Sequence, residues 1–442
     1  MNGSNLSLLW GVPFLGILLS LSTFPLFLKA FWHRHYGKVI FFWTLCFLVP
    51  ALQYDFTGTT HEIAHVTIRE YIPFIALIGS LFVVTSGIRV KSTWVGRPAG
   101  NASILFVGTV MASLIGTTGA SMVMINPLVQ ANAWRKNKAH IFIFFIFLVS
   151  NIGGALSPMG DAPLFLGFIE GVPFLWPLKS LIAPTAVSTA YLIAVFFIID
   201  SLRFKKEAPH TFPPKVKSRF KVNGKINIIF LFLIISVLVG TTLLQTEMHI
   251  EVLGTKWLIE NILRDSGLIV ITFLSAKMTR KGLRLYNHFS WEPLIEVAKV
   301  FAGIFVTMIP LLAILKAGEM GALGSIISRV NSNGIPNNLM YFWTTGLFSS
   351  FLDNAPSYLI FFHMAGGSVP ALTSSLNQTL MAISMGAVFM GAMTYIGNAP
   401  NFMVRSIAIK QRVEMPSFFS YIVLSVIILG PIFAFVSFIF LK

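Results

Sequence analysis

Long apolar runs separated by short polar segments cover almost the whole chain. Ten of them have the length that crosses a bilayer, because a spanning helix needs about 20 apolar residues. They lie at about 6–28, 37–54, 71–90, 139–168, 180–200, 226–246, 258–276, 292–315, 379–408 and 417–441. The runs are continuous, whereas a transmembrane β-barrel alternates apolar and polar residues over about 10 positions. The pattern therefore predicts an all-α polytopic membrane protein.

Two further apolar stretches, at 100–133 and 339–366, do not fit as simple spans. Small and polar residues interrupt each in its middle, with G-T-T-G-A-S at 116–121 and D-N-A-P-S at 353–357. Each is predicted to form a re-entrant hairpin, in which two half-length helices meet at a tip inside the membrane. The non-helical backbone at such a tip must be surrounded by protein or by a water-filled cavity. The alternative is two ordinary tilted helices joined by a short loop.

Two of the spanning runs carry helix-breaking segments that resemble each other. The first reads S-N-I-G-G-A-L-S-P-M-G-D-A-P-L-F from residue 150, and the second reads G-A-M-T-Y-I-G-N-A-P-N-F from residue 391. A shift of 237 positions (391 − 154) lays Gly154 on Gly391 and Asp161 on Asn398, and it also lays one hairpin tip on the other. Paired broken segments of this kind are the best sequence pointer to a transporter built from inverted repeats.

The offset divides the chain into two inverted repeats of five transmembrane helices, each with one hairpin and one discontinuous helix. The first repeat covers 1–200, with its hairpin at 100–133 and its broken helix at 139–168. A basic cytoplasmic linker occupies 201–225. The second repeat covers 226–442, with its hairpin at 339–366 and its broken helix at 379–408.

Charge supports a membrane location and predicts an orientation. Of the 442 residues 55% are hydrophobic and 11% charged, against roughly 25% charged in soluble proteins. The net charge of +16 is explained by basic cytoplasmic loops rather than by a nucleic-acid partner, because cytoplasmic loops are enriched in Lys and Arg. Such segments lie at 29–38, 89–98, 134–139, 201–225, 277–288 and 405–412. We therefore predict a multi-pass protein of a bacterial inner (plasma) membrane with both termini outside, and outer loops that hold acids such as Glu62, Glu70 and Glu170.

In an inverted-repeat transporter the two tips and the two breaks meet near the bilayer midplane. The predicted ion-binding residues are Asp161, Asp353, Asn354, Asn398, Thr394, Ser157, Asn151 and Ser150, and the predicted tip-lining residues are Thr117, Thr118, Ser121, Ser357 and Asn401. Asp161 and Asp353 are the acids predicted deepest in the membrane, where an ionised carboxylate is costly unless it is paired or solvated. Na⁺ prefers oxygen ligands, so both are Na⁺ ligand candidates. The alternative role is capping of the half-helix that follows each of them.

These residues lead to a functional hypothesis of cation transport. If Na⁺ and H⁺ compete for one carboxylate, the protein is a Na⁺(Li⁺)/H⁺ antiporter, with a small inorganic cation and protons as its only transported partners and no cofactor. A Na⁺- or H⁺-coupled citrate or dicarboxylate carrier is the first alternative, and an arsenite efflux permease is the second. No P-loop and no Ser-His-Asp arrangement is recognisable, and Cys46 is the single cysteine, so the chain is not predicted to be an enzyme.

The run S-N-I-G-G-A-L-S-P-M-G-D at 150–161 resembles the pattern of NhaD-type sodium/proton antiporters. The tip S-S-F-L-D-N-A-P at 349–356 is similar to the Asp-Asn-x-Pro tip of those antiporters and of arsenite permeases. Both groups belong to the ion transporter superfamily, together with the citrate and divalent anion carriers. The resemblance implies that Asp161, Asp353 and Asn354 are ion-site residues. It also implies a homodimer in which a transport domain of hairpins and broken helices moves like an elevator against a scaffold.

Overall fold

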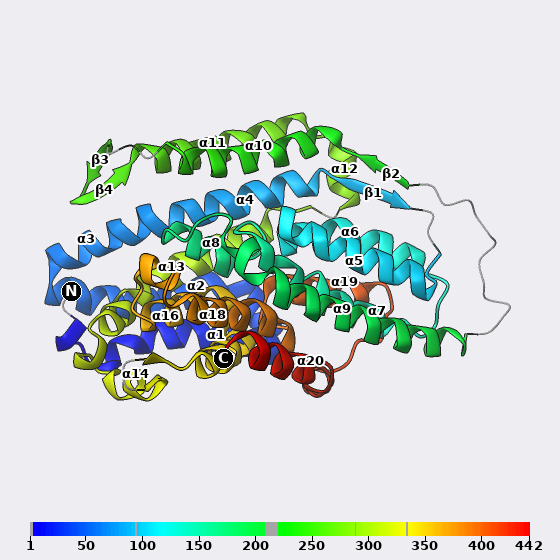
Figure 1. Ribbon diagram of the computed structural model, residues 1–442. Helices are drawn as coiled ribbons and strands as arrows, with labels where there is room; N and C mark the ends of the chain where they lie inside the picture. The colour runs from blue at the N-terminus through cyan, green and yellow to red at the C-terminus, as the bar shows by residue number, and fades with distance from the viewer. Residues whose placement is uncertain are drawn as a thin grey trace.

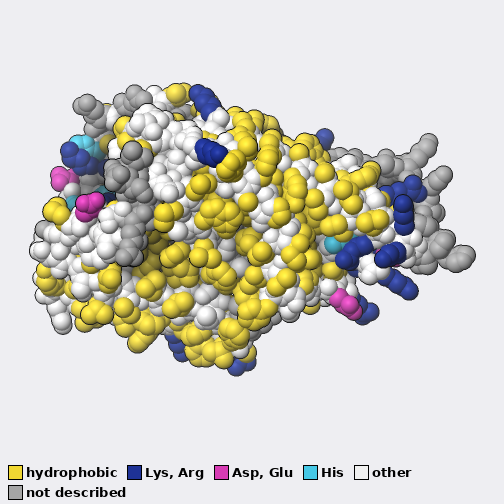
Figure 2. Space-filling model, turned by 60° about the horizontal axis from the view of Figure 1, so that its bottom comes forward, with side chains coloured by type: hydrophobic (Ala, Val, Ile, Leu, Met, Phe, Trp, Pro, Cys, Tyr) yellow, Lys and Arg dark blue, Asp and Glu magenta, His cyan; other side chains and the backbone are white. Residues whose placement is uncertain are grey.

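The computed structural model describes residues 3–92, 95–207, 220–244, 246, 248–287, 289–332 and 335–442. These residues are mostly helical, as Figure 1 shows, so the prediction of a helical polytopic membrane protein is confirmed. In the described part of the chain, nine helices are long and apolar enough to cross a membrane. Figure 2 shows hydrophobic side chains over the middle of one face, with Lys and Arg gathered toward one end.

Among the described residues, the first half of the chain contains nine α-helices. They are α1 (Val12–Phe27), α2 (Lys29–Tyr54), α3 (Phe56–Val66), α4 (Ile72–Ser86), α5 (Pro98–Ile115), α6 (Thr117–Ala131), α7 (Ala139–Leu148), α8 (Ala162–Ile169) and α9 (Trp176–Phe204). A π-turn, η3 (Thr67–Tyr71), joins α3 and α4 without a break in the helix. Glu62 and Glu70 therefore lie on a continuous helix from Phe56 to Ser86, and their predicted location in an outer loop is wrong.

The part of the second half that the structure describes contains eleven α-helices. They are α10 (Lys225–Thr242), α11 (Ile259–Met278), α12 (Lys281–Tyr286), α13 (Glu292–Lys316), α14 (Gly324–Val330), α15 (Asn338–Leu352), α16 (Asn354–Met364), α17 (Val369–Leu372), α18 (Asn377–Met390), α19 (Ala399–Lys410) and α20 (Phe418–Phe440). Helix α11 packs beside α10 and α4 but is not among the nine apolar helices, because Glu260, Arg264, Asp265 and Lys277 lower its hydropathy.

Three short antiparallel strand pairs, which the sequence analysis did not predict, complete the described elements. They are β1 (Arg89–Ser92) with β2 (Phe220–Asn223), β3 (His249–Val252) with β4 (Thr255–Leu258), and β5 (Asn331–Ser332) with β6 (Ile335–Pro336). The predicted basic linker is thus structured at both ends, since α9 continues to Phe204 and β2 begins at Phe220. Its central part lies outside the described residues.

A buried charged cluster joins four segments of the first half. The Asp200 carboxylate on α9 pairs with Arg135 Nη2 at 2.6 Å and with His140 Nε2 at 2.8 Å, and Asn101 Nδ2 on α5 donates to its second oxygen at 3.1 Å. The side chains of Asp200 and Arg135 are fully buried. This cluster fixes the hairpin α5–α6, the broken helix that starts with α7, and α9 relative to one another.

We expect Asp200→Asn to lower the free energy of unfolding by about 3–5 kcal/mol, because it leaves the buried Arg135 charge without its partner. The unfolding midpoint of the detergent-purified protein in a denaturant titration measures this loss. Asp55→Asn is the matched control, since Asp55 caps α3 by accepting from Gly58 N and Asn caps helices about equally well. Equal midpoints for both variants would contradict a stabilising role of the cluster.

Candidate functional site

The first hairpin turns at a single residue, Gly116. Helix α5 ends at Ile115 and α6 begins at Thr117, so two helices meet at this tip, and the polar residues that follow Gly116 are helical. Gly116 has φ 81° and ψ 150°, and a Cβ there would lie 3.2 Å from the Met159 carbonyl oxygen. This is backbone that glycine adopts readily. Helix α5, with 18 residues, is also long enough to cross a bilayer by length and composition.

The second hairpin turns at Asp353 in almost the same conformation. Helix α15 ends at Leu352, Asp353 has φ 79° and ψ 144°, and α16 begins at Asn354. The carboxylate of Asp353 accepts a hydrogen bond from its neighbour, Asn354 N, at 2.7 Å. Asp353 therefore caps α16, as the capping alternative expected, and does so in strained backbone that non-glycine residues rarely occupy.

Each predicted break is a short 3₁₀ segment between two helices. In the first, η4 (Ile152–Leu156) separates α7 from α8. In the second, η7 (Gly391–Met393) separates α18 from α19. In each break the chain passes so close to itself that only glycine fits. A Cβ on Gly160 would clash with the Gly154 carbonyl oxygen at 2.1 Å, and a Cβ on Gly397 would clash with the Gly391 carbonyl oxygen at 2.6 Å.

In each half, hydrogen bonds hold the break to the neighbouring hairpin. The bonds of the second half repeat those of the first at positions shifted by 237 residues. Ser113 donates to the carbonyl of Gly153, and Ser350 donates to the carbonyl of Met390. In return Ser157 donates to the carbonyl of Ser113, and Thr394 donates to the carbonyl of Ser350. The hydroxyl groups of Ser157 and Thr394, predicted ion ligands, thus satisfy unwound backbone. The serines at 113 and 350 were missed, although the 237-residue offset pairs them.

Asp161 is where both hairpins and both breaks meet. Asp161 is 6% exposed, and its carboxylate accepts only from uncharged groups of the described chain. Thr117 Oγ1 donates to Oδ1 at 3.2 Å, Asn354 Nδ2 to Oδ2 at 2.7 Å, and Asn398 Nδ2 lies 3.2 Å from both oxygens. The backbone N–H of Ala162 adds a fourth donor at 3.2 Å.

A chain of buried amides extends from this carboxylate. The Asn398 amide also lies 3.1 Å from the Ser150 carbonyl oxygen and 3.3 Å from Asn151 Oδ1. Asn151 donates to Asn401 Oδ1 at 2.7 Å, and Asn401 donates to the Gly391 and Thr394 carbonyls at 2.9 Å each. The structure thus brings together five of the predicted residues, Asp161, Asn354, Asn398, Asn151 and Asn401, with Thr117 as the sixth.

The other predicted residues lie around this centre in supporting positions. The hydroxyl groups of Ser121 and Ser150 are 3.0 Å apart and connect α6 to the first break. Ser357 donates to the Asp353 carbonyl oxygen at 2.7 Å within the first turn of α16. Thr118 is half-buried in the first turn of α6. No group of three His, Cys, Asp or Glu side chains in the described residues is arranged to hold a metal ion.

The direction of the helices gives the site its electrostatic character. Four helices, α6, α8, α16 and α19, begin at the site, and four others, α5, α7, α15 and α18, end next to it. Helix N-termini carry partial positive charge and favour anions, whereas C-termini favour cations. The site therefore combines four anion-attracting helix ends with a buried carboxylate and several carbonyl groups that attract a cation.

The fold and this site define a multi-pass helical membrane protein of the transporter class, with its polar centre built from interrupted helices. The chain belongs to the family CitMHS_2, described as "Putative citrate transport", whose model matches residues 3–441. This match supports the broader part of the resemblance, a transporter family of the ion transporter class. A search of curated proteins found no match to the chain.

We expect Asp353→Gly to raise the free energy of unfolding by about 1 kcal/mol or more, because it removes backbone strain of about 1–3 kcal/mol and loses only a few tenths for the cap. Unfolding midpoints of the detergent-purified variants measure the gain. Asp353→Asn keeps the strained backbone and serves as the control. A midpoint for Asp353→Gly no higher than that of Asp353→Asn would contradict the strain at this tip.

Proposed function

We propose that the protein is a secondary active transporter that carries citrate or a related carboxylate anion together with a coupling cation, Na⁺ or H⁺. The observation that carries this proposal is the meeting of four helix N-termini around Asp161. Helix N-termini bind carboxylates through their unpaired N–H groups. The family match over residues 3–441 supports the same substrate class.

The buried Asp161 gives a physical reason for coupling. A carboxylate substrate near the Asp161 carboxylate would be repelled unless a cation or a proton lies between them. The amides of Asn354 and Asn398 can present their oxygens to a cation as readily as they present their N–H groups to Asp161. Binding of the cation at Asp161 would then precede or accompany binding of the anion. The anion would therefore not be transported without the cation.

The transport movement that fits this site is an elevator in a homodimer of inverted repeats. Supporting it, the hydrogen bonds of Ser113 with the first break recur at Ser350 with the second, and Gly116 and Asp353 share one backbone conformation. The moving part would consist of the hairpins α5–α6 and α15–α16 with both broken helices. Helices α1 to α4, α10, α11 and α13 would form the scaffold. The domain boundaries at 1–200 and 226–442 belong to the same proposal.

A second candidate is the Na⁺(Li⁺)/H⁺ antiporter, which the NhaD-type pattern at 150–161 favours. Asp161 and Asp353 are both present at the site, and competition between Na⁺ and H⁺ for Asp161 would produce exchange without an organic substrate. The two candidates differ in their substrate, since the carrier transports citrate and the antiporter exchanges only Na⁺ and H⁺. The family match favours the carrier.

We expect proteoliposomes with the purified protein to accumulate radiolabelled citrate under an inward Na⁺ or H⁺ gradient. Asp161→Asn should reduce the initial rate by about tenfold or more, since a hydrogen bond to a charged group contributes about 1.5–3 kcal/mol. Asp55→Asn, on α3 outside the site, should leave the rate unchanged. If neither gradient drives citrate uptake, and NaCl instead collapses a preformed ΔpH in everted vesicles, the carrier is wrong and the antiporter is favoured.

The offset that lays Asp161 on Asn398 allows a swap experiment. Asn398→Asp alone places two carboxylates about 3 Å apart, where like charges disfavour joint ionisation, so citrate uptake should fall strongly. The double variant Asp161→Asn, Asn398→Asp restores one acid and one amide across the same contact, and it should recover part of the uptake. Uptake by the double variant no higher than by Asp161→Asn would show that the two positions are not interchangeable.

A further inference from the structure

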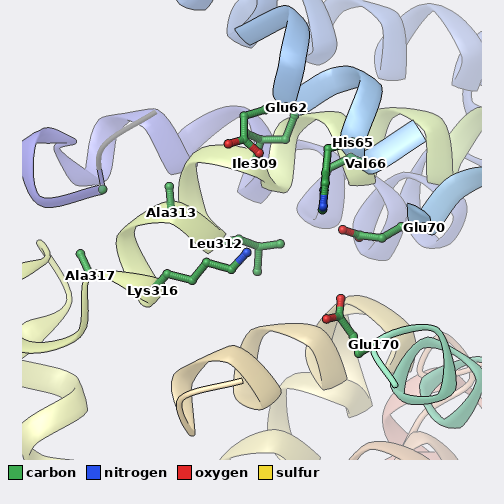
Figure 3. A pocket seen from close by; sticks show the side chains of 11 residues that line it. Glu62, His65, Val66, Glu70, Glu170, Ile309, Leu312, Ala313, Lys316 and Ala317 are labelled. Carbon is green, nitrogen blue, oxygen red and sulfur yellow. The ribbon is translucent and has the colours of Figure 1, made fainter. Parts of the chain in front are cut away.

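A polar cavity of about 310 Å³ lies apart from the helix breaks, between α3, η3 and α13 on one side and the end of α8 on the other. Three carboxylates, one imidazole and one ammonium group line it. These residues are Glu62, Glu70, Glu170, His65 and Lys316. Figure 3 shows His65 and Glu70, on the continuous helix through η3, directed toward Glu170 at the end of α8 and Lys316 on α13. Lys316 is exposed, so the cavity reaches the surface.

Glu70 is the unusual member of this set. It is 5% exposed, and its Oε2 has no hydrogen-bond partner among the described residues. A buried carboxylate oxygen without a hydrogen-bond partner is costly inside a membrane protein and indicates a functional group. Glu70 also belongs to the π-turn η3, and π-turns inside helices occur frequently at functional sites.

The opposite wall of the cavity connects directly to the Asp161 site. Helices α8 and α16 pack against each other and are linked by polar contacts at both ends. At their beginnings Asn354 donates to Asp161 at 2.7 Å, and at their far ends His363 Nε2 lies 3.7 Å from Glu170 Oε1. Glu170 therefore lies one short helix, about 12 Å, from Asp161.

The charges in the cavity favour protons over a chelated metal ion. No three His, Cys, Asp or Glu side chains in the described ranges are close enough to hold a metal. Burial acts to raise the pKa of the Glu170 carboxyl, but the neighbouring His363, with Lys316 and His65, lowers it overall. Glu170 is thus an ionised partner across the cavity from Glu70. The charged and titratable groups around Glu70 are Glu62, His65 and Arg69 on its own helix, Lys316 on α13, Glu170 after α8 and His363 on α16.

We propose that this cavity is a proton-binding site open to one aqueous side, in which Glu70 takes up and releases protons opposite the Glu170–His363 pair. Only a proton moves: hydronium in the cavity gives it to a carboxylate oxygen of Glu70 and becomes water, and the reverse step returns it. Each transfer changes the charge facing the shared end of α8 and α16. The use of this proton in transport rests on the proposed carrier function, whereas the binding itself does not.

Infrared difference spectra of the purified protein across a pH titration test the site without any transport assay. We expect Glu70→Gln to remove one pH-dependent carboxyl C=O band. Glu296→Gln is the matched control, because Glu296 lies on α13 about 30 Å along the helix from Lys316 and accepts from Trp32 Nε1 at 3.2 Å. The spectrum of Glu296→Gln should keep the band assigned to the Glu70 carboxyl group. If Glu70→Gln removes no band that changes with pH, the proposal is overturned.

The pH profile of citrate uptake tests the role of the site in transport. We expect Glu70→Gln to lose the pH dependence that the wild type and Glu296→Gln show on the side where the cavity opens. Size-exclusion profiles establish that both variants are folded. A Glu70→Gln profile identical to the wild type would overturn the role of the site in transport. If the wild type itself transports no citrate, the carrier function fails, and the infrared titration alone decides on the proton site.

Discussion

The structure depends on one constraint: backbone that leaves the helical conformation inside an apolar protein must find new hydrogen-bond partners. Both helix breaks meet it in the same way, with a serine of the neighbouring hairpin donating to the break and a hydroxyl of the break donating back. The hairpin and the broken helix of each half are therefore one unit. A hairpin that moved without its break would lose the two hydroxyl hydrogen bonds between them and leave the carbonyl groups that accept them unsatisfied.

This constraint also explains why the polar centre is rich in amides. The NH2 group of an asparagine carries two N–H donors, so it can satisfy a carbonyl on one side and a carboxylate or second carbonyl on the other, while the amide oxygen still accepts. Asn398 does both, between the Ser150 carbonyl and Asp161, and Asn401 repeats the arrangement toward Gly391 and Thr394. Because Asn398 stands where the first half has Asp161, the carboxylate faces uncharged amide, hydroxyl and backbone N–H groups rather than a second acid.

Much of this centre could be predicted from the sequence because its signals are local. Glycine, proline and aspartate within apolar runs marked both breaks and both tips, and one offset of 237 residues related them. At each tip one residue with positive φ reverses the chain, and the polar residues after it continue as helix, a detail that the residue pattern did not specify. Asp353 stands where the first tip has glycine, and the sequence alone gave no sign of the strain this imposes.

The parts that escaped prediction depend on contacts between residues far apart in the chain. Asp200 meets Arg135 and His140, and Glu70 faces Glu170, because helices pack that way and not because of any motif. The acids at positions 62 and 70 were assigned to a loop, since polar residues ahead of an apolar run usually mark its end. Here the helix continues through a π-turn, which directs Glu70 inward toward the cavity instead of outward to solvent.

The two parallel helices α8 and α16 give these separate regions a physical connection. Both begin at the Asp161 carboxylate and both end at the Glu170–His363 pair, so neither end can shift by much without the other. Short helices with polar contacts at both ends behave as rigid rods, because their backbone hydrogen bonds resist stretching. In the proposed carrier, a change of charge at the cavity and occupancy of the Asp161 site would therefore act on the same two helices, which gives the two sites a physical route for coupling.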